Sequence, residues 1–223
     1  MALGKLVVVS ILILCVLLGA VYLIGQNRSR SILVACVGDS LTELTEYPCD
    51  LMNKLGDDYV LCNFGISATT VTLASESSYM DSTLFQSALD FKPDIVIIML
   101  GTNDARPNLF PFNSTFVDDY ITLINAFQKL SHSPEIWLVL PPPIFDDQSG
   151  AISPEYFEQI ILPGIRQVAD ETNLPVIDVY SHLIDCSEYF PDGVHPAKTT
   201  ENLGNEPVAQ IIATTIYEAI TTP

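Results

Sequence analysis

The chain has 223 residues and a formal net charge of −18 at neutral pH. All 27 acidic residues follow residue 30, where only six lysines and arginines accompany them. A surface this acidic repels polyanions, so we expect no nucleic-acid partner.

An uncharged apolar segment opens the sequence. Residues 6–25 contain no charged side chain, and twenty residues in a helix span about 30 Å, the thickness of a bilayer's hydrocarbon core. The segment is longer than the apolar centre of a cleaved signal peptide and lacks a clear Ala-x-Ala site. We therefore predict a transmembrane signal anchor and a short linker over residues 1–30, with membrane attachment through residues 6–25. A cleaved signal peptide is the alternative.

The remaining residues, 31–223, are long enough for one domain with a single core. We expect this domain to be lumenal or extracytoplasmic, because a signal-like segment precedes it; cleavage of that segment would give a secreted protein. The sequence does not predict an oligomeric state.

Strand-like and helix-like stretches alternate through this domain. Apolar runs predict five strands, at residues 32–37, 59–64, 94–100, 136–140 and 176–179. Helical spacing and capping residues predict helices over residues 43–55 and 83–91, two more that start near Ser114 and Ser153, and a last one over residues 208–220. Pro163-Gly164 should kink or restart the helix that starts near Ser153. This order predicts an α/β fold with a parallel sheet covered by helices on both faces.

Polar turns follow the strands and are expected at one edge of the sheet. In an open parallel sheet, ligands bind at the carboxyl ends of the strands. The turns are Gly38-Asp39-Ser40-Leu41-Thr42, Asn63-Phe64-Gly65, Gly101-Thr102-Asn103-Asp104 and Asp192-Gly193-Val194-His195-Pro196.

These turns contain the side chains that acyl transfer requires. A serine hydroxyl becomes a good nucleophile when a base takes its proton, and histidine is the usual base near neutral pH. We predict Ser40 as the nucleophile, His195 as the base and Asp192 as the carboxylate that orients the imidazole. The backbone N–H groups of Ser40 and Gly65 and the side-chain amide of Asn103 are the predicted oxyanion hole.

Together, the turns resemble the four motif blocks of the SGNH hydrolase, or GDSL-type esterase, superfamily, in the same order and over nearly the whole domain. The resemblance implies a three-layer, flavodoxin-like fold with a central five-stranded parallel sheet, and it implies the same roles for the five residues named above. The sequence departs from the family pattern at two positions. Glu43 stands where many members have glycine, and Ala68 stands where the second block usually continues with Ser-Gly.

Three further segments resemble the carbohydrate acetylesterase branch, which includes proteins similar to sialate O-acetylesterases: residues 93–104, 140–143 and 190–196. This implies a serine esterase that removes a small acyl group, expected to be acetyl, from a sugar through an acyl-enzyme. Arg106 is a candidate to pair with a substrate carboxylate; a solvated or salt-bridged loop arginine is the alternative. Lysophospholipase, thioesterase or acyltransferase activity on the same triad, and a non-catalytic binding or structural role, are the other hypotheses.

The remaining candidate side chains have structural interpretations. His132 and His182 are expected to be hydrogen-bonded rather than catalytic. No histidine and carboxylate cluster has metal-ligand spacing, so we expect no metal and no cofactor. The five cysteines contain no Cys-x-x-Cys pair, which favours free thiols. One disulfide between two of them is the alternative.

Overall fold

The structure is a computed structural model that describes residues 30–146, 150–197 and 208–222. By their backbone contacts the residues divide into two units, Met1–Ser31 and Ile32–Pro223, and the second unit is the subject here. The predicted signal anchor at residues 6–25 lies outside the described residues. Within the three described ranges, no helix combines the length and apolar character needed to cross a membrane.

One parallel sheet of five strands forms the centre of the Ile32–Pro223 unit, in the order β2-β1-β3-β4-β5. This order confirms the predicted flavodoxin-like arrangement. β3 is buried along its whole length, which explains its uninterrupted apolar sequence. The strands are β1 (Ile32–Gly38), β2 (Tyr59–Gly65), β3 (Ile95–Met99), β4 (Glu135–Leu140) and β5 (Val176–Asp178).

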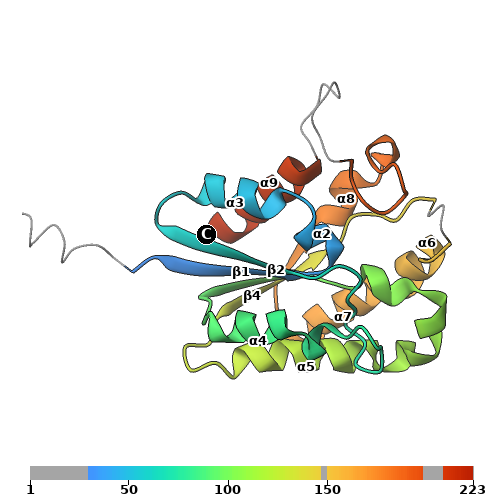
Figure 1. Cartoon of the computed structure of the whole chain (residues 1–223), viewed down its shortest axis with the longest axis horizontal. Coiled ribbons are helices and arrows are strands. Elements are labelled where there is room, and N and C mark those ends of the chain that lie inside the picture. The colour runs from blue at the N-terminus through green and yellow to red at the C-terminus, as the bar shows by residue number, and fades with distance from the viewer. Residues whose placement is uncertain (1–29, 147–149, 198–207, 223) are drawn as a thin grey trace, which may run out of the picture. The chain divides into compact units, whose positions relative to one another are not determined.

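Helices cover both faces of the sheet, as predicted (Figure 1). One face packs against α4 (Thr83–Asp90), α5 (Phe116–Gln128) and α7 (Leu162–Thr172), and the other against α3 (Tyr47–Leu55), α8 (Val179–Leu183) and α9 (Val208–Thr221). Successive strand residues alternate between the two resulting cores. Each fully buried aliphatic or aromatic side chain contributes roughly 1.5–3 kcal/mol to stability.

Two predicted helices are interrupted where proline changes the hydrogen bonding. The helix predicted over residues 43–55 begins only at Tyr47, as α3, and Glu43 instead ends a separate short helix, α2 (Ser40–Glu43). Pro48 has no N–H and fits only the first turn of α3. The helix from Ser153 continues from α6 (Pro154–Tyr156) through a π-helical turn at Phe157–Ile161 into α7. That turn ends just before Pro163, which also cannot donate to the helical ladder.

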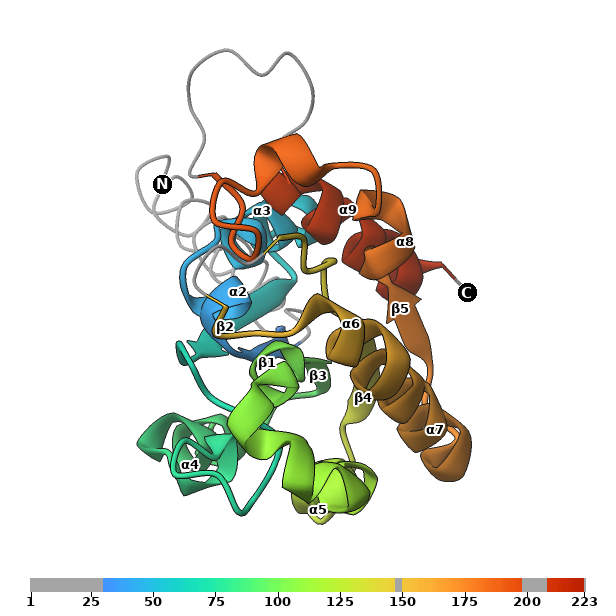
Figure 2. The same ribbon diagram turned by 90° about the vertical axis from the view of Figure 1, so that its right-hand side faces the viewer.

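Short 3₁₀ segments complete the elements, at Tyr79–Asp81, Thr102–Ala105, Pro107–Thr115 and Ser187–Tyr189. The cysteines in the described part of the chain, Cys36, Cys49, Cys62 and Cys186, are all free. Figure 2 looks onto the edge of the sheet that carries α2 and α6. This is the carboxyl edge, where the predicted polar turns were expected.

Candidate active site

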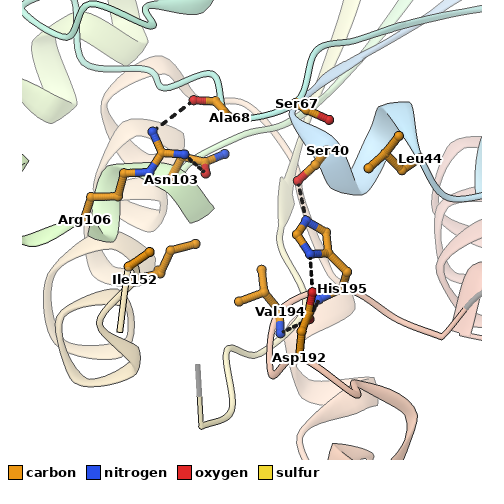
Figure 3. Close-up of a pocket in the computed structure, with 11 residues that line it drawn as sticks. Ser40, Leu44, Ser67, Ala68, Asn103, Arg106, Ile152, Asp192, Val194 and His195 are labelled. Carbon is orange, nitrogen blue, oxygen red and sulfur yellow. Dashed lines mark hydrogen bonds and ion pairs between the residues drawn. The ribbon is translucent and has the colours of Figure 1, made fainter. Parts of the chain in front are cut away.

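Ser40 is held at this edge as the first residue of α2. β1 ends at Gly38, and the Asp39 carboxylate accepts the N–H of Leu41 at 2.9 Å, which caps the short helix. Ser40 is 7% exposed, and Figure 3 shows its hydroxyl directed toward the imidazole of His195. Ser40 therefore stands on backbone fixed by β1, an interior strand of the sheet.

The three predicted triad residues are in hydrogen-bonding contact. Ser40 Oγ lies 2.8 Å from His195 Nε2, and His195 Nδ1 lies 2.8 Å from Asp192 Oδ2 (Figure 3). The other carboxylate oxygen of Asp192 accepts the backbone N–H groups of Val194 at 2.9 Å and His195 at 2.6 Å. With the carboxylate accepting from Nδ1–H, the Nε2 atom is free to accept the serine proton.

Asp192 is ionised in this arrangement. Partial burial works to raise the pKa of its carboxyl, but the N–H groups of His195 and Val194 outweigh burial and place that pKa below its ordinary value. An ionised carboxylate stabilises the imidazolium that forms when His195 takes a proton.

Asn103 lies on the 3₁₀ turn that follows β3, and its side chain is buried and held on both sides. Its Nδ2 donates to the carbonyl oxygen of Thr69 at 3.1 Å and to Asp39 Oδ2 at 3.3 Å. Its Oδ1 accepts from Arg106 Nη2 at 2.7 Å. The amide nitrogen is thereby turned to the Ser40 side of the pocket (Figure 3).

The geometry corrects the predicted oxyanion role of Gly65. Its N–H donates to Asn63 Oδ1 at 2.8 Å, and it is not among the residues that line the pocket. A Cβ atom at this position would lie 2.4 Å from the backbone nitrogen of Glu43. Gly65 is a packing glycine that lets α2 approach β2.

Ala68 is a pocket residue that the sequence analysis did not include among the candidate donors. It lines the pocket and has a left-handed backbone with φ of 67°. Among the described residues, the N–H groups of Gly65, Ile66 and Ser67 each have an acceptor, whereas those of Ser40 and Ala68 have none. The signal was the departure from Ser-Gly, since a left-handed position favours glycine.

Arg106 reaches the pocket, but its guanidinium is turned toward the protein. Besides the contact with Asn103, Nη1 donates to the carbonyl oxygen of Ala68 at 3.2 Å. The predicted pairing with a substrate carboxylate therefore competes with two existing hydrogen bonds.

Two buried carboxyls lie beneath the site. Burial raises the pKa of Asp39 to about 7 and that of Asp104 to about 6, against the opposing effect of their N–H donors. Asp104 accepts the backbone N–H groups of Val71 and Thr72 at 2.9 and 2.8 Å, and the Thr72 hydroxyl at 2.6 Å. Asp104 thus ties the loop after β2 to the turn after β3.

The cavity beside Ser40 has a volume of about 680 Å³, within the range of small-molecule sites. Within the described ranges, no group of three or more histidine, cysteine or acidic side chains is placed to hold a metal ion. The cavity is lined by Ser40, Leu44, Ser67, Ala68, Asn103, Arg106, Ala151, Ile152, Asp192, Val194 and His195.

Sequence comparison finds a matching family and a related protein. The sequence model of the GDSL-like lipase/acylhydrolase family matches residues 36–200. An acetylxylan esterase of Xylanibacter ruminicola is 32% identical over 219 residues, covering 86% of this chain and 45% of that protein. The chain thus spans about half the length of the curated relative it matches.

Solved structures share the fold. A carbohydrate acetylesterase from Sinorhizobium meliloti superposes with a TM-score of 0.66 at 21% identity, covering 85% of this chain and 98% of that one. A lipase/acylhydrolase from Enterococcus faecalis superposes with a TM-score of 0.67 at 21% identity, covering 85% of this chain and 95% of that one. A catalytic mutant of an acetylxylan esterase from Geobacillus stearothermophilus superposes with a TM-score of 0.65 at 19% identity, covering 88% of this chain and 97% of that one.

Proposed function

The chain belongs to the GDSL-like lipase/acylhydrolase family, and on this premise we propose that it is a serine esterase that removes acetyl groups from carbohydrate hydroxyls. The observation that carries the proposal is the continuous hydrogen-bonded series from Ser40 Oγ through His195 to Asp192, open to a cavity. In this series a nucleophile, a base and an orienting carboxylate each have the required partner.

The proposed reaction begins when Ser40 Oγ attacks the ester carbonyl carbon and its proton passes to His195 Nε2. The C–O bond to the sugar then breaks, the sugar oxygen takes the proton from His195, and an acetyl-Ser40 intermediate remains. A water molecule then gives a proton to His195 and attacks the acetyl carbon. The bond from that carbon to Ser40 Oγ breaks, acetate leaves, and the proton on His195 passes to Ser40 Oγ. General-base assistance of this kind contributes about 10² to 10⁴ in rate.

The oxyanion that forms in each attack needs donors that are already in place. The free N–H groups of Ser40 and Ala68 supply two, and Asn103 Nδ2 supplies the third. Its 3.3 Å contact with Asp39 is long for a hydrogen bond, so this N–H is readily shared with a substrate oxygen. Loss of one such donor typically costs about 10² to 10³ in kcat.

Acetylated carbohydrate is the substrate class best supported. The relative from Xylanibacter ruminicola is an acetylxylan esterase, and the cavity of about 680 Å³ accommodates an acetyl group with part of a sugar. The net charge of −18 favours neutral over anionic sugars.

The test compares the full chain with Ser40→Ala. We expect the wild type to hydrolyse 4-nitrophenyl acetate and acetylated xylo-oligosaccharides, and Ser40→Ala to lose at least about 10³-fold in kcat. Ser87→Ala is the matched control, because Ser87 lies on α4 and its hydroxyl donates within that helix. Equal rates for wild type and Ser40→Ala would reject the mechanism.

The same assay separates the alternative functions. Preference for a lysophospholipid or an acyl thioester, or transfer of acetyl from the ester to an added sugar, would replace the carbohydrate esterase assignment with the corresponding activity. Absence of any Ser40-dependent turnover across this panel would favour a non-catalytic binding role.

We also propose that residues 6–25 anchor the protein in a membrane, with the catalytic domain lumenal or extracytoplasmic. The uncharged twenty-residue run supports this. The anchored protein should stay in the membrane pellet after an alkaline carbonate wash. Recovery of a shortened chain in the medium would identify a cleaved signal peptide instead.

A further inference from the structure

We propose that Arg106 is a positioning residue that sets the orientation of two oxyanion-hole donors, Asn103 and Ala68. The inference rests on the proposed esterase function and assigns Arg106 a role different from binding a substrate carboxylate. Figure 3 shows the guanidinium on the far side of Asn103 from Ser40, with one hydrogen bond to each of the two donor residues.

The contact with Asn103 selects one of two amide orientations. A guanidinium has only donors, so the atom that faces Arg106 at 2.7 Å has to be the amide oxygen. The amide nitrogen then faces Ser40, Thr69 and Asp39. A flipped amide would set its NH₂ group against the guanidinium and its oxygen against the Thr69 carbonyl, both of them repulsive contacts.

The contact with Ala68 holds a backbone conformation that alanine disfavours. A left-handed φ brings the Cβ too close to a carbonyl oxygen and is therefore sterically unfavourable for alanine. Arg106 Nη1 binds the carbonyl oxygen of Ala68 at 3.2 Å, and on the preceding side the Glu43 carboxylate accepts the N–H of Ser67. The free Ala68 N–H lies between these two anchors.

The charge of Arg106 also acts on the donors. Its hydrogen-bond acceptors, Asn103 Oδ1 and the Ala68 carbonyl, are both neutral. Among the described residues the guanidinium has no carboxylate in ion-pair contact, although Asp104 is close enough to interact electrostatically. A hydrogen bond from a cation polarises the Asn103 amide and makes its N–H groups stronger donors.

The principal experiment measures kcat and KM of the full chain and of Arg106→Ala on 4-nitrophenyl acetate, which has no carboxylate. A donor misplaced by about 1 Å costs on the order of 10²-fold, so we expect kcat to fall by about 10- to 100-fold with KM changed by less than about 3-fold. Arg166→Ala is the matched control, because Arg166 pairs with Asp178 on the exposed surface and its loss should leave kcat unchanged.

Chemical rescue distinguishes positioning from a general effect on folding. Millimolar guanidinium should restore part of the kcat of Arg106→Ala, and the same concentration of ammonium should not, because only the planar fork reaches both carbonyl oxygens. A lysine at this position, in Arg106→Lys, should recover less of the wild-type kcat than guanidinium restores to Arg106→Ala. A kcat loss that guanidinium does not relieve, together with a lowered Tm, would overturn the proposal in favour of a purely structural role.

A second substitution tests the Ala68 contact. Ala68→Gly removes the steric cost of the left-handed backbone, so it should raise kcat more in the Arg106→Ala background than in the wild type. Equal effects in the two backgrounds would mean that Arg106 does not act through Ala68.

The outcomes separate this inference from the proposed function. An unchanged kcat in Arg106→Ala, or a loss confined to acetylated sialic acid while acetylated neutral sugars are unaffected, would overturn the positioning role and leave the esterase assignment intact. If the wild type and Arg166→Ala both lack Ser40-dependent activity, the esterase assignment fails first.

Discussion

At the scale of single residues, hydrogen-bond partners decide what each histidine does. His195 contacts the Ser40 hydroxyl and the Asp192 carboxylate. His132, in contrast, has its Nε2 atom 2.7 Å from the carbonyl oxygen of Pro93, away from the pocket. The two imidazoles are chemically alike, and only their surroundings make one a candidate base.

His195→Ala should therefore lower kcat by about 10² to 10⁴-fold, since His195 is the group placed to take the Ser40 proton. His132→Ala should change kcat little while lowering Tm. Steady-state assays on 4-nitrophenyl acetate check both. A comparable kcat loss in the two variants would contradict the assignment.

The sequence analysis predicted the side chains that meet at the pocket but did not predict the proposed backbone donor, Ala68. Ser40, Asp192, Asn103 and His195 belong to residue types with recognisable chemistry, at turns that follow predicted strands. Ala68 contributes an N–H group, which every residue except proline carries, so composition does not mark it. Its role depends on which N–H groups lack an acceptor, and that is a property of the folded loop.

At the scale of elements, the close approach of α2 to β2 sets the position of Ser40, the proposed nucleophile. α2 carries Ser40, and a Cβ at Gly65 would lie 2.4 Å from the Glu43 nitrogen. Gly65→Ala should push α2 away from the sheet, destabilise the fold by roughly 1–3 kcal/mol and lower kcat as well.

Gly164→Ala provides the matched comparison. There the new Cβ would lie 2.9 Å from Phe116 Cδ1, in the packing between α5 and α7. It should lower the free energy of unfolding similarly, measured by urea denaturation, and leave kcat unchanged below the transition. Equal kcat for Gly65→Ala and the wild type would contradict the role of α2 packing.

The strands were predicted well because buried parallel strands are continuous apolar runs, and β3 is the clearest example. Helix boundaries were less accurate. The split between α2 and α3, and the π-helical turn before α7, follow from how prolines are accommodated in three dimensions.

At the scale of the whole molecule, the balance of buried and exposed carboxyls sets the response to pH. Asp39 and Asp104 have pKa values of about 7 and about 6 in the folded protein, above the ordinary 3.8. Between the ordinary pKa of 3.8 and these raised pKa values, the folded state binds more protons than the unfolded state. The free energy of unfolding therefore falls as pH rises from about 4 to 7.

We expect the protein to be more stable at pH 5 than at pH 8, by on the order of 1 kcal/mol or more. Repulsion among exposed acidic side chains acts in the same direction, but 1 M NaCl screens it beyond about 3 Å. Thermal unfolding at both pH values in 1 M NaCl isolates the buried carboxyls. Stability that is equal or greater at pH 8 in high salt would contradict the raised pKa values.

The sequence by itself determined the fold class and predicted the three residues that meet in the Ser40–His195–Asp192 series, because alternating apolar patterns specify strands and helices, and strand ends place their turns at one edge of a parallel sheet. Only the tertiary structure decided which N–H groups are available for the proposed oxyanion hole. It assigned Gly65 to packing, brought the free N–H of Ala68 to the pocket, and turned Arg106 toward Asn103. Those relations depend on the approach of loops far apart in the chain and on which polar groups already have partners, and neither is encoded in local spacing.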